Sequence, residues 1–177
     1  MPDVTVPDDS MPDSEVALLT RLLSGSNLRR RFRQNAEEVA RQLTDEPLLV
    51  SFLMSLDHPQ LEAQAATLIM KRQHEVAQLL PMTWRLFSKS APTLFQAYTE
   101  ESPWPEGHAR HLLDAEAFGL WLVTGSHVEP VATEWNRLRF LVSGRRAAIR
   151  IARDPATRYR LQILFRGSGG RVRELIF

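Results

Sequence analysis

Apolar residues recur at helical spacing through most of the chain and at a spacing of two near its C-terminal end. Over residues 14–142 they fall three or four residues apart, which is typical of α-helices with one buried face. After Ser143-Gly144 the pattern alternates along three runs, which is typical of β-strands. The chain therefore predicts an α+β fold: a mainly helical domain, 14–142, followed by a small three-stranded antiparallel sheet, 145–177.

Capping residues and prolines mark the boundaries of the first helices. Ser14 is an expected N-cap, Asn27 is expected to cap the next helix, and a break is expected near Asn35. Asp57 opens the longest helix, which Pro81 ends or kinks because proline lacks the amide donor.

Turn-forming residues mark the later boundaries. The segment SPWPEGH predicts a loop, because two prolines and a glycine crowd it. Gly125 is expected to end the helix that follows this loop, and residues 128–142 are expected to form the last helix.

The first two predicted strands each carry one apolar set of alternate positions and one set that contains arginines. We expect the apolar set to pack on the helices and the arginines to face solvent. The apolar set comprises Ala147, Ile149, Ile151, Tyr159, Leu161, Ile163 and Phe165. The third run alternates too, and glycine-rich GSGG predicts the turn before it.

Charge is unevenly distributed although the net charge is only +1. Residues 1–13 are acidic and proline-rich, which predicts a disordered tail. Residues 136–177 carry eleven arginines and two acids and no lysine. Arginine presents a planar fork of donors that suits carboxylates and phosphates. This basic quarter predicts either a binding surface or only a well-solvated one.

Several classes of protein are disfavoured. The chain has no cysteine, which excludes disulfides and thiolate sites. His108, His111 and Asp114 lie at spacings that do not converge cleanly on one metal, and no phosphate-binding glycine motif occurs. We therefore expect no enzyme activity, no metal and no cofactor. Neither a signal peptide nor a membrane span is evident, so cytoplasmic localisation without membrane association is the expectation.

The arginine-bearing sheet is the strongest positive signal for function. A small sheet has open edges, which offer main-chain donors and acceptors to an extended peptide. The candidate peptide-binding residues are Arg150, Arg158, Tyr159, Arg160, Arg171 and Arg173. Trp104, between two prolines, is a candidate partner contact, with core packing as the alternative. The arginines could also serve only to keep an edge soluble.

Residues 79–140 resemble the helical accessory subunits of multinuclear non-heme iron-dependent oxidases, which include the partner proteins of methanobactin and pearlin (3-thiaglutamate) biosynthesis. The segments that carry the resemblance are LLPMTWRLF, LFQAYTEESP, RHLLDAEAFGLWL and ATEWNRLRF, with LRRRFRQNAEEVARQL nearer the N-terminus. The matching residues are Leu79, Leu80, Pro81, Thr83, Phe95, Tyr98, Asp114, Ala115, Phe118, Glu134 and Arg139.

The resemblance implies a non-catalytic subunit of an enzyme complex. Its partners would be an iron-dependent TIM-barrel oxidase and a ribosomally made precursor peptide whose cysteine is oxidatively modified. The C-terminal strands would engage the leader of that peptide. The alternative is a DNA-binding regulatory protein that uses the basic C-terminal quarter. We expect nucleic-acid binding to be weak at most, because the arginines lie on predicted strands and no helix-turn-helix is evident.

Overall fold

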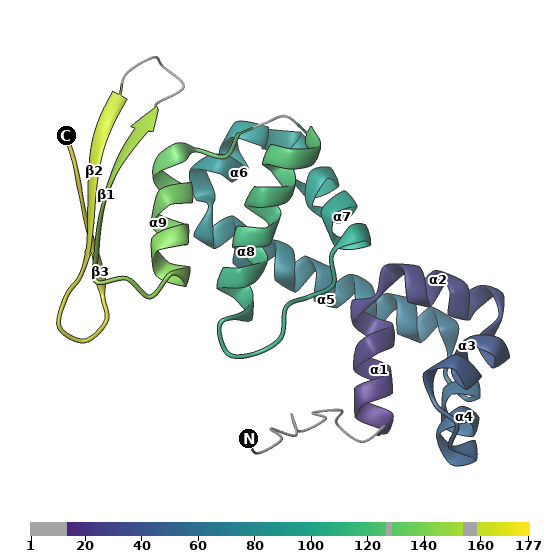
Figure 1. Ribbon diagram of the computed structural model, residues 1–177. Coiled ribbons are helices and arrows are strands. Elements are labelled where there is room, and N and C mark those ends of the chain that lie inside the picture. The colour runs from purple at the N-terminus through teal and green to yellow at the C-terminus, as the bar shows by residue number, and fades with distance from the viewer. Residues whose placement is uncertain (1–13, 127–128, 154–158) are drawn as a thin grey trace, which may run out of the picture. The chain divides into compact units, whose positions relative to one another are not determined.

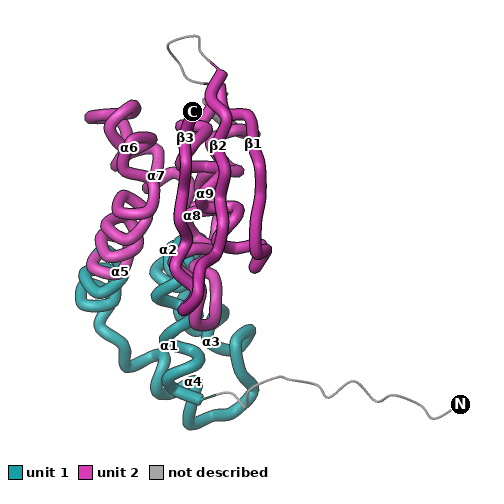
Figure 2. The backbone as a smooth tube through the Cα atoms, turned by 90° about the vertical axis from the view of Figure 1, so that its left-hand side faces the viewer, with its two compact units in different colours: residues 1–66 teal, residues 67–177 magenta. Residues whose placement is uncertain are grey.

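The computed structural model describes residues 14–126, 129–153 and 159–177. Helices are followed by a three-stranded antiparallel sheet, which confirms the predicted α+β fold (Figure 1). The chain divides into two compact units, residues 1–66 and 67–177 (Figure 2). The helices expected to form one domain are thus shared between two units. The predicted tail, 1–13, lies outside the described residues.

The first unit is a small helical body with a leucine-rich core. Its helices are α1 (Glu15–Ser24), α2 (Ser26–Gln34), α3 (Ala36–Leu43), α4 (Pro47–Met54) and the beginning of α5 (His58–Leu79). Each contributes buried apolar side chains at helical spacing, so the amphipathic pattern of the sequence is what closes this core. The core residues are Leu18, Leu22, Phe32, Val39, Ala40, Leu43, Leu49, Leu53 and Leu61.

Side-chain caps explain where three of these helices begin. The Ser14 Oγ accepts from the amide of Ala17 at 3.2 Å, and the Asp57 carboxylate accepts from the amide of Gln60 at 3.1 Å. Asn35 caps α3, which confirms the break expected there. The expectation for Asn27 is wrong. Helix α2 already begins at Ser26, because Gly25 occupies the N-cap position and its carbonyl accepts from Arg29.

The second unit is built on an aromatic core. Its helical part comprises the rest of α5, then α6 (Pro81–Phe87), a 3₁₀ turn η1 (Ser88–Ser90), α7 (Ala91–Glu101), α8 (Arg110–Trp121), a π-helical turn η2 (Leu122–Ser126) and α9 (Ala132–Val142). Phe118 lies at the centre, with ring centroids 5.2 Å from Phe95 and 5.4 Å from Tyr98. Such spacing suits edge-to-face and tilted aromatic contacts.

Two predicted helix boundaries in this unit are wrong. Gly125 does not end a helix but lies inside η2, where the helix continues with a wider turn. The last helix begins at Ala132 rather than at 128. Pro130 disfavours helical geometry at the residue before it, and Val131 at the N-cap has a non-helical backbone, with φ −59° and ψ 119°. Residue 128 itself lies outside the described residues.

Two contacts place α9 within the second unit. Gly119 of α8 faces the Trp135 indole so closely that a Cβ there would lie 2.6 Å from its Cε3. The Glu134 carboxylate accepts from the amides of Met82 and Thr83 at 2.6 and 2.7 Å, at the N-terminal end of α6. A carboxylate there satisfies free helix amides and complements the helix dipole. Helix α9 is therefore a firmly placed support for the sheet.

The sheet begins after a short turn at the end of α9. Its strands are β1 (Ala147–Arg153), β2 (Tyr159–Arg166) and β3 (Val172–Ile176), in the order β1-β2-β3, so both β1 and β3 are edges. The register places Ile149 opposite Ile163, which in turn lies opposite Leu175. Figure 2 shows the three strands side by side in front of α9, with no described helix in front of them.

Candidate functional site

The side of the sheet that faces α9 is attached to this helix by buried side chains and by hydrogen bonds. Ala152, Gln162 and Leu164 are buried there. The Gln162 amide donates to the Thr133 carbonyl at 2.9 Å and to Glu174 at 2.7 Å. The Arg166 guanidinium donates to the Leu141 carbonyl at 3.3 Å, and it lies over the Phe140 ring. These bonds attach β2 along the length of α9.

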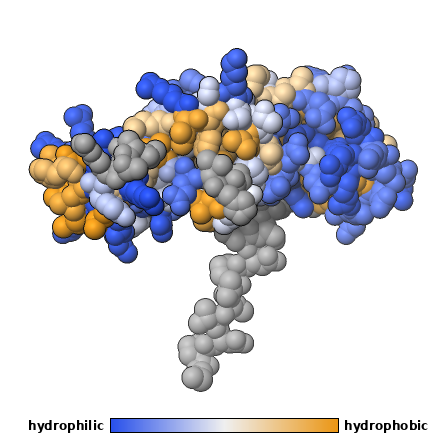
Figure 3. Space-filling model, turned by 90° about the horizontal axis from the view of Figure 1, so that it is seen from above, coloured by the Kyte–Doolittle hydropathy of each residue, from blue (hydrophilic) through white to orange (hydrophobic). Residues whose placement is uncertain are grey.

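The opposite side, which we call the outer face, is apolar and exposed. Ile149 and Ile151 are 65% and 71% exposed, and Phe177 is 71% exposed. Tyr159, Leu161 and Leu175 are exposed on the same face. Figure 3 shows hydrophobic residues gathered at the left-hand end of the molecule, where Figure 1 places the strands. An uncovered apolar surface of this kind is typical of an interaction site.

The predicted orientation of the sheet is therefore wrong, although the alternation itself is correct. Isoleucines expected to pack on the helices point outward, and Arg150 and Arg160 share the α9 side with the buried Gln162. The physical reason is that Ala148 and Ala152 let α9 approach closely, while Gln162 and Arg166 find backbone acceptors on that helix. Alternation fixes which residues share a face and leaves open which face is covered.

The candidate arginines do not form one cluster. Arg150 and Arg160 lie on the α9 side, whereas Tyr159 and Arg173 lie on the outer face. Arg171 precedes β3, where its carbonyl accepts from the amide of Gly167. Arg158 lies outside the described residues, so its predicted role has no structural description.

Strand β1 presents an open main-chain edge. The Arg166 amide donates to the Arg146 carbonyl at 2.8 Å, which identifies this pair as hydrogen-bonded. In an antiparallel ladder the bonding direction alternates along the strand. The main-chain groups of Ala147, Ile149 and Ile151 therefore point away from β2. These are the donors and acceptors that an added strand would use.

Two pockets lie beside β1 on its α9 side. The first is basic and is lined by Asn136, Arg139, Phe140, Ser143, Arg145, Ala148 and Arg150. No carboxylate lines it, and the only ion pair shown for its arginines among the described residues joins Arg139 to Glu116 at 3.9 Å. The second is largely apolar and is lined by Met82, Val131, Ala132, Thr133, Ala152, Arg153 and Arg160. Sequence reasoning missed Arg139, Arg145 and Asn136 as site residues, because α9 and the turn after it reach β1 only through the fold.

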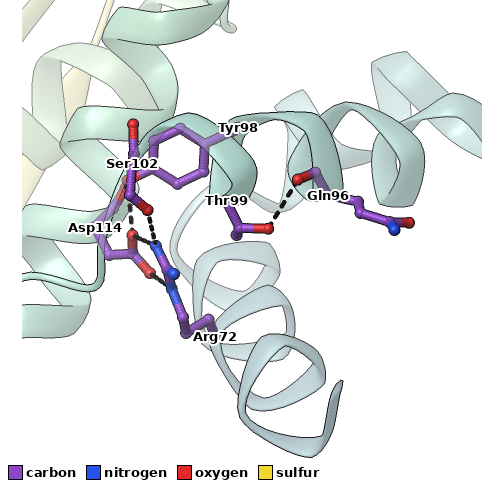
Figure 4. Close-up of polar contacts among 6 residues, drawn as sticks. All are labelled: Arg72, Gln96, Tyr98, Thr99, Ser102 and Asp114. Atoms are coloured by element: carbon purple, nitrogen blue, oxygen red, sulfur yellow. Dashed lines mark hydrogen bonds and ion pairs between the residues drawn. The ribbon is translucent and has the colours of Figure 1, made fainter. Parts of the chain in front are cut away.

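A buried ion pair lies within the helical part of the second unit (Figure 4). The Arg72 guanidinium donates from Nε and Nη2 to the two Asp114 oxygens, at 3.0 and 2.8 Å. The Tyr98 hydroxyl donates to the same carboxylate at 2.7 Å, and Arg72 Nη2 also reaches the Ser102 carbonyl at 3.4 Å. Arg72 and Asp114 are 2% and 1% exposed, so each charge depends on the other for compensation.

Sequence reasoning missed Arg72, although a signal was present. It falls in helical phase with the buried Ala65 and Val76, on the core face of α5. A charged residue at a core position needs a charged partner. No pattern identifies that partner as Asp114, because the two residues are 42 positions apart.

Trp104 lies against this network. Its ring is half-buried, with the guanidinium groups of Arg110 and Arg72 at 4.3 and 5.9 Å from the ring centroid. Its indole nitrogen is buried and lacks a hydrogen-bond partner in the described structure. Cation–π contacts of this kind stabilise the loop between α7 and α8. The proposed partner contact at Trp104 stays a prediction.

The Tyr98 hydroxyl makes stability depend on pH. Burial, with the adjacent Asp114 carboxylate, raises the pKa of Tyr98 well above its ordinary value of 10.0. The neutral hydroxyl is thus favoured by folding, and its contribution is complete below the unfolded pKa and lost as pH rises through the folded one. Between about pH 9 and about pH 11 we expect the free energy of unfolding to fall by up to about 1 kcal/mol more in the wild type than in Tyr98→Phe.

Urea denaturation across this pH range tests that expectation. Tyr159→Phe is the matched control, because Tyr159 is the other tyrosine of the chain and is 73% exposed. The control should keep the pH dependence of the wild type. Equal slopes for the wild type and Tyr98→Phe would contradict the assignment.

Neither a metal-binding cluster nor a membrane-spanning helix occurs among the described residues. No group of three or more His, Asp or Glu side chains is placed to hold a metal ion there. Asp114, which the sequence places near His108 and His111, accepts hydrogen bonds from Arg72 and Tyr98 instead of facing a metal site. None of the helices in the described part of the chain combines the length and hydrophobicity that crossing a bilayer requires.

The fold and surface define a helix-rich chain that ends in a small sheet with an open edge and an uncovered apolar face. A family model described as SCO6045-like, C-terminal domain, matches residues 54–124. The match covers less than half of the chain, contains Arg72, Tyr98 and Asp114, and ends before α9 and the sheet. No curated protein and no solved structure matches the chain. The link to partner subunits of iron-dependent oxidases stays a prediction.

Proposed function

We propose that this chain is a non-catalytic accessory subunit that binds a ribosomally made precursor peptide and a partner iron-dependent oxidase. In this role it supports oxidative cysteine modification in the biosynthesis of a peptide natural product. The oxidase would carry the iron and the chemistry. The sequence resemblance supplies the biological setting, and the sheet supplies the binding surface.

The observation that carries the proposal is the open edge of β1. Strand β1 pairs with β2, and β2 is hydrogen-bonded to α9 through Gln162 and Arg166. The β1 edge is therefore held in place before a peptide binds. Main-chain bonding to an edge gives affinity that tolerates many side chains. A preformed edge also lowers the ordering cost of binding.

The two pockets beside β1 give this edge selectivity. Side chains of an added strand alternate, so every second residue would point toward α9. One such residue would meet Arg139, Arg145 and Arg150, and a carboxylate is the group that these three guanidiniums bind best. Another would meet the apolar pocket at Val131 and Ala152. The preferred peptide therefore carries an acidic and an apolar residue on the same face of the strand.

The arrangement favours a peptide over DNA. The arginines of the described strands are divided between the two sides of the sheet, and the outer face is dominated by isoleucine, leucine and phenylalanine. Duplex DNA binding instead needs a continuous basic surface that follows the phosphates. Nanomolar, sequence-specific DNA binding at physiological salt would favour the DNA-binding alternative.

The arginine-lined pocket should contribute to the affinity for the peptide. The probe is the short cysteine-containing peptide that we expect to be encoded, with an oxidase, beside the gene for this chain. Changing both Arg145→Glu and Arg150→Glu should weaken binding of the labelled peptide by about 1–3 kcal/mol, because charge-assisted hydrogen bonds are lost. Fluorescence anisotropy titration gives the dissociation constants.

A charge-matched control separates this site from a general electrostatic effect. Arg33 and Arg85 are exposed residues of α2 and α6 and line neither pocket, so Arg33→Glu with Arg85→Glu changes the net charge equally without changing the sheet. The control should bind nearly as the wild type does. An equal loss of affinity in both double variants would show that the arginines of the pocket act only through the net charge of the protein. No peptide binding by the wild type would contradict the proposed function.

A further inference from the structure

The outer face of the sheet breaks the usual pattern for a sheet with one solvated side. Such sheets alternate apolar residues toward the core and polar residues toward water. Here the exposed side carries Ile149 in register with Ile163 and Leu175, and Ile151 in register with Leu161. Leu161 also exchanges main-chain hydrogen bonds with Phe177, which extends the apolar ladder to the last residue. Three neighbouring strands thus contribute to one continuous apolar surface.

We infer that this outer face docks a folded protein partner whose apolar patch is bordered by carboxylates. The inference rests on the proposed function and names the surface that would meet the partner oxidase. The β1 edge remains available for the peptide, so the same small sheet would bind two partners through different chemical groups. Side chains of the outer face would contact the protein, and main-chain groups of β1 would contact the peptide.

Charge identifies the chemistry of the partner. Arg173 lies on the outer face opposite Phe165, near one end of the sheet, whereas Arg153 near the other end lines the apolar pocket on the α9 side. The described strand residues that point to this side include no Asp or Glu, since Glu174 points to the α9 side, where it bonds Gln162. The face is therefore apolar over most of its length and positive at the end that carries Arg173. An acidic border on the partner matches it.

A second copy of this chain fits the face poorly. A symmetric contact repeats one patch on both subunits, so Arg173 of each copy would meet an apolar or a positive surface and no carboxylate of the described strands.

The probe is the purified iron-dependent oxidase that we expect to be encoded beside the gene for this chain. Changing Leu175→Thr and Phe177→Thr removes apolar surface at the β3 side of the outer face, away from the β1 edge, and threonine suits a strand. Both side chains are exposed, so folding should be preserved. We expect oxidase binding to weaken about tenfold or more, the range of central interface residues, and peptide binding to stay within about twofold. Arg173→Glu should also weaken oxidase binding, whereas Arg173→Lys should retain most of it.

Controls make each outcome decisive. Leu48→Gln removes a leucine of α4 that is 77% exposed and is not part of the sheet, and this variant should bind the oxidase as the wild type does. Oxidase binding that the Leu175 and Phe177 changes leave intact overturns this inference alone. No oxidase binding by the wild type overturns the proposed function and the inference together. If the wild type self-associates in sedimentation and the same changes abolish this, the face binds a second copy. If the wild type binds phosphatidylcholine–phosphatidylserine vesicles and the same changes abolish this, the face binds a membrane. Either result overturns the inference.

Discussion

Replacing Arg72 with methionine should lower the free energy of unfolding by about 3–5 kcal/mol, the cost of leaving a buried charge without its partner. The Asp114 carboxylate is 1% exposed and would keep only the Tyr98 hydroxyl as a side-chain donor. Methionine fills a similar volume, so the loss comes from charge rather than from a cavity. Urea denaturation followed by circular dichroism measures it.

A second substitution separates charge from packing at this site. Adding Asp114→Asn to the Arg72→Met protein should recover part of the lost stability, because the uncompensated charge disappears while an acceptor for Tyr98 remains. Arg85→Met, an exposed arginine on α6, should change stability by no more than about 0.5 kcal/mol. A double variant that is less stable than Arg72→Met would contradict this account of the ion pair.

Gly119→Ala should destabilise the second unit by about 1–3 kcal/mol, because it overpacks the contact between α8 and α9. In an exposed helix the same change would usually stabilise. Here the added methyl would meet the six-membered ring of Trp135, with its Cη2 at 2.8 Å. The ring is packed against the aromatic core and cannot retreat freely. Because α9 carries the sheet, peptide binding should weaken in parallel with stability.

Gly125→Ala is the matched control for that prediction. Its added Cβ would meet only Trp121 Cε2, at an ordinary contact distance of 3.9 Å. Little change in the free energy of unfolding is expected. Combining Gly119→Ala with Trp135→Leu should restore part of the loss, because the smaller side chain vacates the space. Equal stability of Gly119→Ala and the wild type would show that α8 and α9 can separate at no cost.

Local chemistry made much of the fold predictable. Ser14, Asn35 and Asp57 identify helix starts because their side chains satisfy free amides within three residues. The strands follow from alternation over 147–176. Orientation of the sheet did not follow, because both sets of alternate residues include apolar members. Leu164, on the side that carries Arg150 and Arg160, is fully buried, while Ile151 on the other side is exposed.

The candidate site was less predictable than the fold. The sequence indicated the sheet and its arginines, and it gave Arg150 as a candidate residue, which the structure places in the lining of the basic pocket. It could not bring Arg139 of α9 beside Arg150 of β1, because that proximity depends on which side of the sheet the helix covers. The ion pair of Arg72 with Asp114 likewise depends on how α5 and α8 pack. Contacts between distant segments are where sequence patterns carry least information.

If β1 receives the precursor peptide as an added strand, the peptide should protect main-chain amides at that edge. Amide hydrogen exchange of this chain, with and without the peptide, measures this protection. The amides of Ala147, Ile149 and Ile151 point away from β2, so they should exchange fast in the free protein and slow on binding, as new main-chain bonds form. Unchanged exchange at these three amides, with the peptide bound and protection elsewhere, would contradict the account.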